Sequence, residues 1–342
     1  MRLFLLKIAM KRIWKLFVLP FIPLFASCSE NIFGELQDEH IEMTFSPAFT
    51  AVTVPAKAGL YDGDNLISAD HKGDFSVTAY KAGTSQRHFL GMERIFYMYY
   101  PDDPSASRWR FYNSETNSFY ERYWPLTYAL DFFAYMPYDL ADSHVSVDAD
   151  AQTFSCDLPY DKSGQDSARE FVYAFERGQT YDIDEGNVNL EFTHPFSAVN
   201  FMLGQAHGNT EIHNVGLTGI CNKGTFSFPS ETWEYTAPVV DLDIEVGKTV
   251  GASGNAGIQL NSHIGGPYLV VPQATGGIYV TVSFTWNGTT VNASVPLEEG
   301  NWLPGRIYTY KLTLGDNQED IIADVSVVPW EVIDYRNDID IE

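Results

Sequence analysis

The residue most clearly marked for covalent chemistry is Cys28, whose thiol follows the small residues Ala26 and Ser27. The 27 residues before it contain five basic side chains and no acidic one, and an apolar run fills residues 14–25. A basic start, a short apolar segment and small residues before a cut are typical of an export signal. We therefore predict that residues 1–27 are a signal peptide.

The apolar run is too short to cross a membrane, because a bilayer core of about 30 Å needs about 20 helical residues. Pro20 and Pro23 also interrupt it. The Cys at the cut resembles the lipobox of bacterial lipoproteins, which predicts lipid, including palmitate, on Cys28 and an anchor in the cell outer membrane. Several acyl chains anchor a protein stably in a membrane where one chain does not, since each buried CH₂ adds about 0.8 kcal/mol to the binding free energy. An ordinary secretory signal is the alternative, and Met10 is a second candidate start beside Met1.

Residues suited to catalysis or metal binding form no recognisable constellation. The eight histidines lie in no HExxH motif, and the chain has neither a GxSxG elbow nor a phosphate-binding GxxxxGK[ST] loop. Residues 62–65 (DGDN) resemble the start of a calcium loop, but its later Gly and Glu are missing. We predict no catalytic residue, no metal and no cofactor, with a hydrolase built from scattered loop residues as an alternative.

Aromatic residues between positions 97 and 112 offer a different chemistry. They are Tyr97, Tyr99, Tyr100, Trp109, Phe111 and Tyr112. Exposed rings stack on sugars, which would make the chain a glycan-binding surface lipoprotein with an aromatic platform. The alternative is that these rings pack in a core and across paired strands.

The charge balance and the cysteine count limit which partners and which cross-links the chain can have. Five of the 21 Lys and Arg residues precede Cys28, so 16 remain against 45 Asp and Glu, a formal charge of −29. Such acidity speaks against nucleic acid as a partner. Two further cysteines, Cys156 and Cys221, are too few for a disulfide framework, and we favour two thiols over one bridge.

Short apolar or alternating runs bounded by Gly, Pro, Asn and Asp recur along the chain, which predicts an all-β fold. Runs at residues 279–286 and 289–295 flank Asn287-Gly288, and this predicts a hairpin because both turn residues accept positive φ. A cluster of Gly and acidic residues at 178–188 predicts a boundary, with one β-sandwich domain over 28–187 and a second over 188–342.

Several segments, taken in order, resemble the Bacteroidetes fimbrillin-like lipoproteins. They are FFAYMPYD (132–139), FTHPFSAVNFML (192–203), VGLTGICNKGTFSF (215–228), PYLVVPQ (267–273), NWLPGRIYTYKLTL (301–314) and IIADVSVVPW (321–330). The resemblance implies two tandem transthyretin-like Greek-key β-sandwiches after the signal peptide. It also implies a structural subunit of the cell-surface fimbriae called type V pili, with a role in adhesion and no enzymatic activity.

In that family, a trypsin-like protease removes the first strand of a shaft subunit, and a strand from another fimbrial subunit fills the groove. Here residues 40–54 are the candidate segment to be removed and Lys57 is the candidate cleavage site. No Arg occurs between Cys28 and Arg87, which leaves an uncleaved anchor or a tip subunit open. Residues 325–333 (VSVVPWEVI) are the more apolar candidate donor. Ser167, in Asp-Ser-Ala, resembles an O-glycosylation acceptor.

Overall fold

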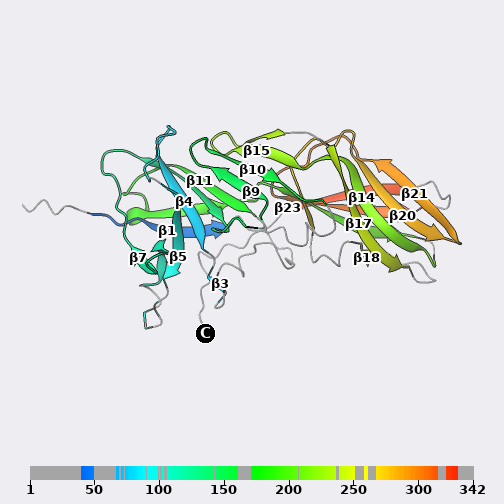
Figure 1. Cartoon of the computed structure of the whole chain (residues 1–342), viewed down its shortest axis with the longest axis horizontal. Helices are drawn as coiled ribbons and strands as arrows, with labels where there is room; N and C mark the ends of the chain where they lie inside the picture. The colour runs from blue at the N-terminus through cyan, green and yellow to red at the C-terminus, as the bar shows by residue number, and fades with distance from the viewer. Residues whose placement is uncertain are drawn as a thin grey trace, which may run out of the picture. The chain divides into compact units, whose positions relative to one another are not determined.

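Strands, together with a short 3-10 helix η2 (Asp184–Gly186), make up the regular structure of the described residues in the computed structural model (Figure 1). The structure describes residues 40–49, 67–68, 71–72, 74–89, 91–98, 100, 102–103, 106–141, 143–160, 171–206, 208–235, 239–250, 258–260, 267–314 and 321–329. Among these residues, no helix is long and apolar enough to span a membrane. The predicted all-β class is confirmed.

The first sheet runs in the order β11-β8-β4-β5-β6-β1-β12, and β7 pairs with β6. Its strands are β1 (Thr44–Phe49), β4 (Phe75–Lys81), β5 (Glu93–Met98), β6 (Arg108–Asn113), β7 (Ser118–Tyr120), β8 (Leu130–Met136), β11 (Val172–Gln179) and β12 (Asn187–Phe192). An antiparallel bridge between Tyr173 and Thr193 links the end of β12 back to β11. A short pair, β2 (Ile67–Ser68) and β3 (His71–Lys72), stands apart from this sheet.

Strand β8 is buried on both faces, since successive side chains of a strand point to opposite sides and all seven of its residues are buried. Phe132, Ala134 and Met136 join one apolar cluster, while Phe133 and Tyr135 join another. The second cluster continues into a sheet of four strands, β16 (Thr232–Tyr235), β15 (Lys223–Ser227), β10 (Thr153–Asp157) and β9 (Val145–Asp148). Their contact with the first sheet includes the stacked rings of Phe133 and Phe228, with centroids 3.8 Å apart.

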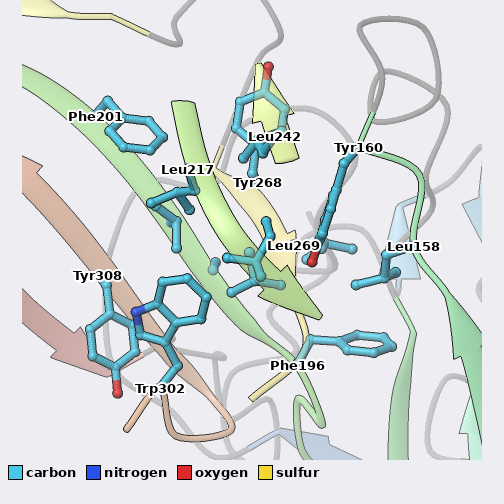
Figure 2. Packing of buried hydrophobic residues seen from close by; sticks show 14 of the residues in the cluster. Leu158, Tyr160, Phe196, Phe201, Leu217, Leu242, Tyr268, Leu269, Trp302 and Tyr308 are labelled. Carbon is cyan, nitrogen blue, oxygen red and sulfur yellow. The ribbon is translucent and has the colours of Figure 1, made fainter. Parts of the chain in front are cut away.

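Two further sheets hold the C-terminal residues. One contains β18 (Ile258–Gln259), β13 (Ser197–Gln205), β22 (Arg306–Leu314), β23 (Ile321–Pro329) and β19 (Tyr268–Val270). The other contains β17 (Val239–Thr249), β14 (Glu211–Cys221), β20 (Tyr279–Trp286) and β21 (Thr289–Pro296), which lie side by side in Figure 1. Trp302 is buried in their core beside Tyr308 (Figure 2), and its indole N–H donates to the Tyr310 hydroxyl at 2.8 Å.

The hairpin predicted at Asn287-Gly288 is confirmed. Trp286 pairs with Thr289 across a two-residue turn, and φ is 49° at Asn287 and 77° at Gly288. These positive angles are the ones that a type I′ turn requires.

The predicted boundary at residues 187 and 188, and with it the count of two sandwiches, stays a prediction. Residues on its two sides share sheets, because β1 pairs with β12 and β10 pairs with β15. Cys156 on β10 and Cys221 on β14 belong to different sheets and are free thiols, the first buried and the second partly exposed, so the two unbridged thiols favoured by the sequence are confirmed. Burial raises the pKa of the Cys156 thiol to about 12, so this thiol is unreactive at neutral pH.

Candidate functional site

Strand β1 lies inside the first sheet, between β6 and β12. It pairs in parallel with β12 over six residues, from Thr44 opposite Asn187 to Phe49 opposite Phe192. Its pairing with β6 is antiparallel and limited to Phe45 opposite Trp109. The strand is therefore fully laddered on one side only, and its side chains supply much of the contact on the other.

The inward side chains of this segment are almost fully buried. Met43 is 0% exposed and Phe45 is 2% exposed, and both belong to the apolar cluster of the first sheet. The Phe45 ring makes edge contacts with Phe111 at 5.3 Å and with Phe75 at 6.0 Å between centroids. Each fully buried side chain of this size contributes about 1.5–3 kcal/mol, so the segment fills an apolar groove rather than covering a surface.

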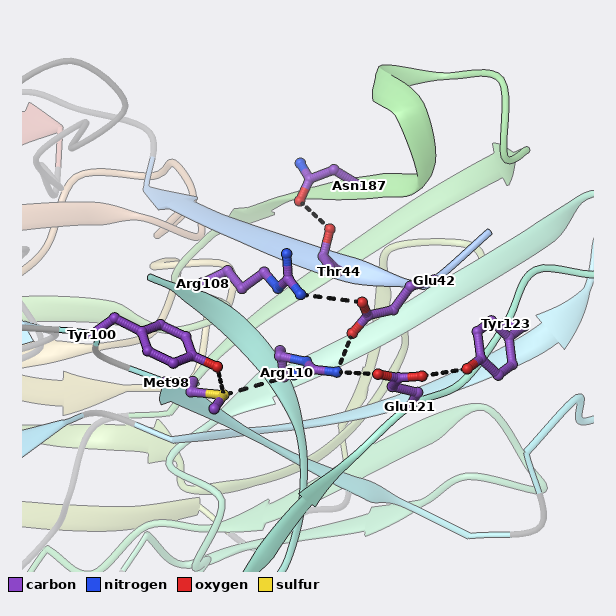
Figure 3. Close-up of polar contacts among 9 residues, drawn as sticks. All are labelled: Glu42, Thr44, Met98, Tyr100, Arg108, Arg110, Glu121, Tyr123 and Asn187. Carbon is purple, nitrogen blue, oxygen red and sulfur yellow. Dashed lines mark hydrogen bonds and ion pairs between the residues drawn. The ribbon is translucent and has the colours of Figure 1, made fainter. Parts of the chain in front are cut away.

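On its outward side, the segment forms ion pairs with the first sheet, as Figure 3 shows. A carboxylate oxygen of Glu42 lies 2.7 Å from the Arg110 guanidinium, and the other lies 3.3 Å from Arg108. Arg110 also contacts Glu121 at 2.9 Å. Hydrogen bonds from Tyr123 and Arg110 hold the pKa of the Glu121 carboxyl below its ordinary value. Arg110 is therefore shared between a carboxylate on the β1 segment and one on the segment that follows β7.

Hydroxyl groups continue this polar side along β1. The Thr44 hydroxyl donates to Oδ1 of Asn187 at 3.2 Å (Figure 3), and the Asn187 amide donates to the Ser46 hydroxyl at 3.0 Å. Glu42, Thr44 and Ser46 are spaced by two residues, as side chains on one face of a strand must be. Together with Arg108 and Arg110, Asn187 forms a set that we call the polar frame of the β1 groove.

The start of the segment is fitted closely against the turn before β12. Trp124 donates its indole N–H to the Gly186 carbonyl at 2.8 Å and its backbone N–H to the Ile41 carbonyl at 3.0 Å. Gly186 has φ of +89°, and a Cβ there would lie 2.6 Å from Ile41 Cγ2 and 2.8 Å from the Glu42 carbonyl. Only glycine allows this approach.

The described C-terminal strand has an uncovered apolar side. β23 lies at the edge of its sheet and pairs with β22 alone. Val325 and Val327 are 43% and 49% exposed, although their partners Tyr310 and Tyr308 are buried. An edge strand that exposes two alternating valines can pair with another chain.

The aromatic cluster predicted from the sequence does not form one platform. Trp109 and Phe111 are buried at 5% and 1% exposure, which is the core packing given as its alternative. Tyr112 lies outside this core, where its ring stacks on Phe96 at 5.1 Å. Tyr99 is outside the described residues.

The structure does not test the other residues singled out in the sequence. Cys28, Lys57, Ser167 and residues 62–65 all lie outside the described residues. In the described part of the chain, no three His, Cys, Asp or Glu side chains are grouped to hold a metal ion.

The polar frame was not predicted, although the sequence carries a signal for it. Its arginines, Arg108 and Arg110, alternate with apolar residues in one strand. Glu121, the second carboxylate on Arg110, and Tyr123 are spaced by two in the segment that follows β7. Alternation places each pair on one face, and the antiparallel fold-back brings the two faces together.

Comparison with known proteins adds the family. A family model described as fimbrillin-like matches residues 71–330, well over half of the chain. The chain belongs to the fimbrillin-like family. Membership implies a fimbrial subunit at the cell surface with a structural rather than an enzymatic role. The β1 segment lies before the matched range.

Solved structures agree with this fimbrillin in fold. A fimbrial protein from Bacteroides vulgatus ATCC 8482 has 16% identity and a TM-score of 0.56, over 84% of this chain and 99% of that chain. A proposed cell adhesion protein from Bacteroides ovatus ATCC 8483 has 16% identity and a TM-score of 0.51, over 86% and 99%. Curated proteins give no match.

Proposed function

We propose that this fimbrillin is a structural subunit of type V pili that polymerises by strand exchange at the β1 groove, with a role in adhesion. The observation that carries the proposal is the position of β1 between two strands that have other neighbours. β6 remains paired with β5 and β7, and β12 remains bridged to β11 through Tyr173 and Thr193. Loss of β1 would therefore leave a groove bounded by β6 and β12, each of which keeps another strand as its neighbour.

The groove would be unstable while empty. Six residues of β12 would lose their ladder partners, and the space of Met43 and Phe45 would open to water. Unpaired backbone groups beside an apolar slot recruit an incoming strand, which is the principle of β-augmentation. Residues 325–333 are the donor that we propose. Their described part, residues 325–329, belongs to the edge strand β23, exposes two valines and would leave its partner β22 to enter the groove.

Delivery and maturation complete the proposal. A lipid on Cys28 would anchor the exported chain in the outer membrane, and a trypsin-like protease would cut after Lys57 and so release both the lipid and β1. Ser167 would carry an O-linked glycan. If the cut does not occur, the lipid is permanent, and the chain serves as an anchor or a tip subunit.

The test is to incubate residues 28–342 with a trypsin-like protease and follow the products on denaturing gels with and without heating. A shaft subunit gives loss of the segment up to Lys57 and a ladder of polymers that collapses on boiling. Lys57→Gln should block both, while Lys162→Gln, which changes a lysine far from the proposed cut in sequence, should block neither. Trimmed protein that stays monomeric at high concentration would contradict strand exchange.

A specific observation also favours glycan binding as a second function. A hollow of about 330 Å³ on the sheet of β14, β17, β20 and β21 is lined by Asn214, Asp243, Thr281, Val282, Ser283, Asn292, Ala293 and Ser294. Amide, hydroxyl and carboxylate groups at this density match the hydroxyls of a neutral sugar. An array of neutral oligosaccharides tests it, because a binder should lose its signal in Asn292→Ala and keep it in Tyr112→Ala. Signal that is absent, or that follows Tyr112 instead, would rule out the hollow.

A further inference from the structure

We propose that the β1 groove selects its occupant by charge, and that the occupant is residues 324–329 of a second copy, bound in register with this chain's own residues 42–47. Arg108 and Arg110 would then hold Asp324 where they now hold Glu42. This inference rests on the proposed strand exchange and adds its register and its chemical selectivity.

The polar frame favours an acidic occupant. The Arg110 side chain is only 10% exposed, and its carboxylate contacts are Glu42 at 2.7 Å and Glu121 at 2.9 Å. Departure of the β1 segment removes the nearer of these, and it also removes the Glu42 contact of Arg108. Arg110 would keep Glu121, but a largely buried charge that loses one of its two carboxylate partners is destabilised. An occupant that brings a carboxylate to this position therefore binds better than one that does not.

The sequence contains a second copy of the β1 pattern. Residues 42–47 (EMTFSP) read as acid, apolar, hydroxyl, apolar, any residue and Pro. Of the 17 prolines in the chain, only Pro47 and Pro329 end such a pattern, and residues 324–329 read DVSVVP. Asp324 corresponds to Glu42, and Ser326 corresponds to Thr44.

The apolar positions agree with the structure of β23. Val325 and Val327, which correspond to Met43 and Phe45, are 43% and 49% exposed in this strand. In the groove they would be buried. Valine is smaller than phenylalanine, so the apolar contribution falls at the second position, and polar contacts gain weight in fixing the register.

A slip of one residue cannot be tolerated, because it turns every side chain to the opposite face. The proposed register points Val325 and Val327 into the apolar groove. It also brings the Ser326 hydroxyl to Asn187, which now accepts a hydrogen bond from Thr44 at 3.2 Å. A slipped strand would set valine against Arg110 and leave Asn187 without this partner.

The experiment uses mature chain 28–342 trimmed by the protease and a fluorescent peptide of residues 319–333, with affinity read from anisotropy. Asp324→Asn in the peptide should weaken binding at least about tenfold, since it breaks a partly buried charge pair. The matched peptide Asp320→Asn, outside the pattern, should bind like the original. Asp324→Arg should recover affinity on Arg110→Glu chain but not on Arg87→Glu chain, whose exposed ion pair with Asp150 lies elsewhere.

The outcomes separate the two proposals. If the original peptide binds and Asp324→Asn binds equally well, or the charge exchange restores nothing, the selection by charge is wrong while strand exchange stands. If the original peptide fails to bind trimmed chain and no polymers form, strand exchange itself is wrong.

Discussion

The guanidinium of Arg110 lies 2.7 Å from the carboxylate of Glu42 and 2.9 Å from that of Glu121. Arg110 belongs to β6, Glu121 follows β7, and Glu42 immediately precedes the buried part of the β1 segment. The Arg110 guanidinium thus connects the β1 segment, which we propose departs during assembly, to the part of the sheet that remains. Under the proposed strand exchange, this contact would link the stability of the monomer to its readiness for assembly.

Glu42→Gln should loosen the β1 segment without unfolding the sheet. The amide keeps the shape but loses the charge that faces two arginines, so we expect about 1–2 kcal/mol lower stability in urea unfolding. Amides of residues 43–49 should exchange with deuterium faster. Asp150→Asn, which removes the 81% exposed partner of Arg87, should cost less than about 0.5 kcal/mol. Equal effects of the two substitutions would deny Glu42 a special role.

Phe45→Ala should destabilise the protein by about 3–5 kcal/mol, because it removes a ring that is 2% exposed and leaves a cavity between Phe75 and Phe111. Chemical denaturation measures this loss. Tyr279→Ala serves as the comparison, since that ring is 42% exposed and should cost far less. A loss below about 1 kcal/mol at Phe45 would mean that β1 does not fill the groove.

Gly186→Ala should show how tightly the start of the segment is fitted. The new methyl group would meet Ile41 Cγ2 at 2.6 Å, so its overlap adds about 1–3 kcal/mol to the cost of positive φ. Gly178→Ala is the matched control, since its φ is +64° but no atom lies within 4 Å of a Cβ there. It should cost only about 1 kcal/mol. Similar losses in thermal unfolding at both positions would contradict the close fit.

Glu176→Gln should stabilise the protein at neutral pH. Burial raises the pKa of the Glu176 carboxyl above its ordinary 4.5, although the backbone N–H of Glu191 donates to it at 3.1 Å. A raised pKa means that the stabilising contribution is present below the ordinary pKa and is lost as pH rises through the folded-state value. The substitution should therefore raise Tm at pH 7 by about 1–3 °C and have no effect near pH 3. An increase that persists at acid pH would contradict burial as its cause, and exposed Glu115→Gln should show none.

Local patterns predicted the strands well because their physical causes lie within a few residues. The turn at Asn287-Gly288 needs two residues that accept positive φ, and five of the nine residues of the final strand over residues 321–329 are the β-branched Ile or Val. The partners of strands depend instead on contacts far apart in sequence. Nothing local to β10 indicates that it pairs with β15, some 70 residues later.

The site was predicted in part for the same reason. Residues 40–54 were expected to be the removable strand, and removal stays a prediction. In their described part, β1 lies between two other strands, and Phe45 in it and Met43 before it are buried. The ionic contacts around it needed the fold, since Glu42 and Arg110 are 68 positions apart. Their pairing follows from the approach of β6 to the β1 segment.

A disulfide that locks β1 in place tests the central claim most directly. Ser46 and Asn189 are register partners on neighbouring parallel strands, whose spacing of about 4.8 Å lies within the range that a disulfide can bridge. The doubly substituted chain, Ser46→Cys with Asn189→Cys, should be cut by the protease yet give no polymers while oxidised, and should polymerise once reduced. Polymers of unchanged yield from the oxidised, cleaved protein would show that assembly does not require β1 to leave.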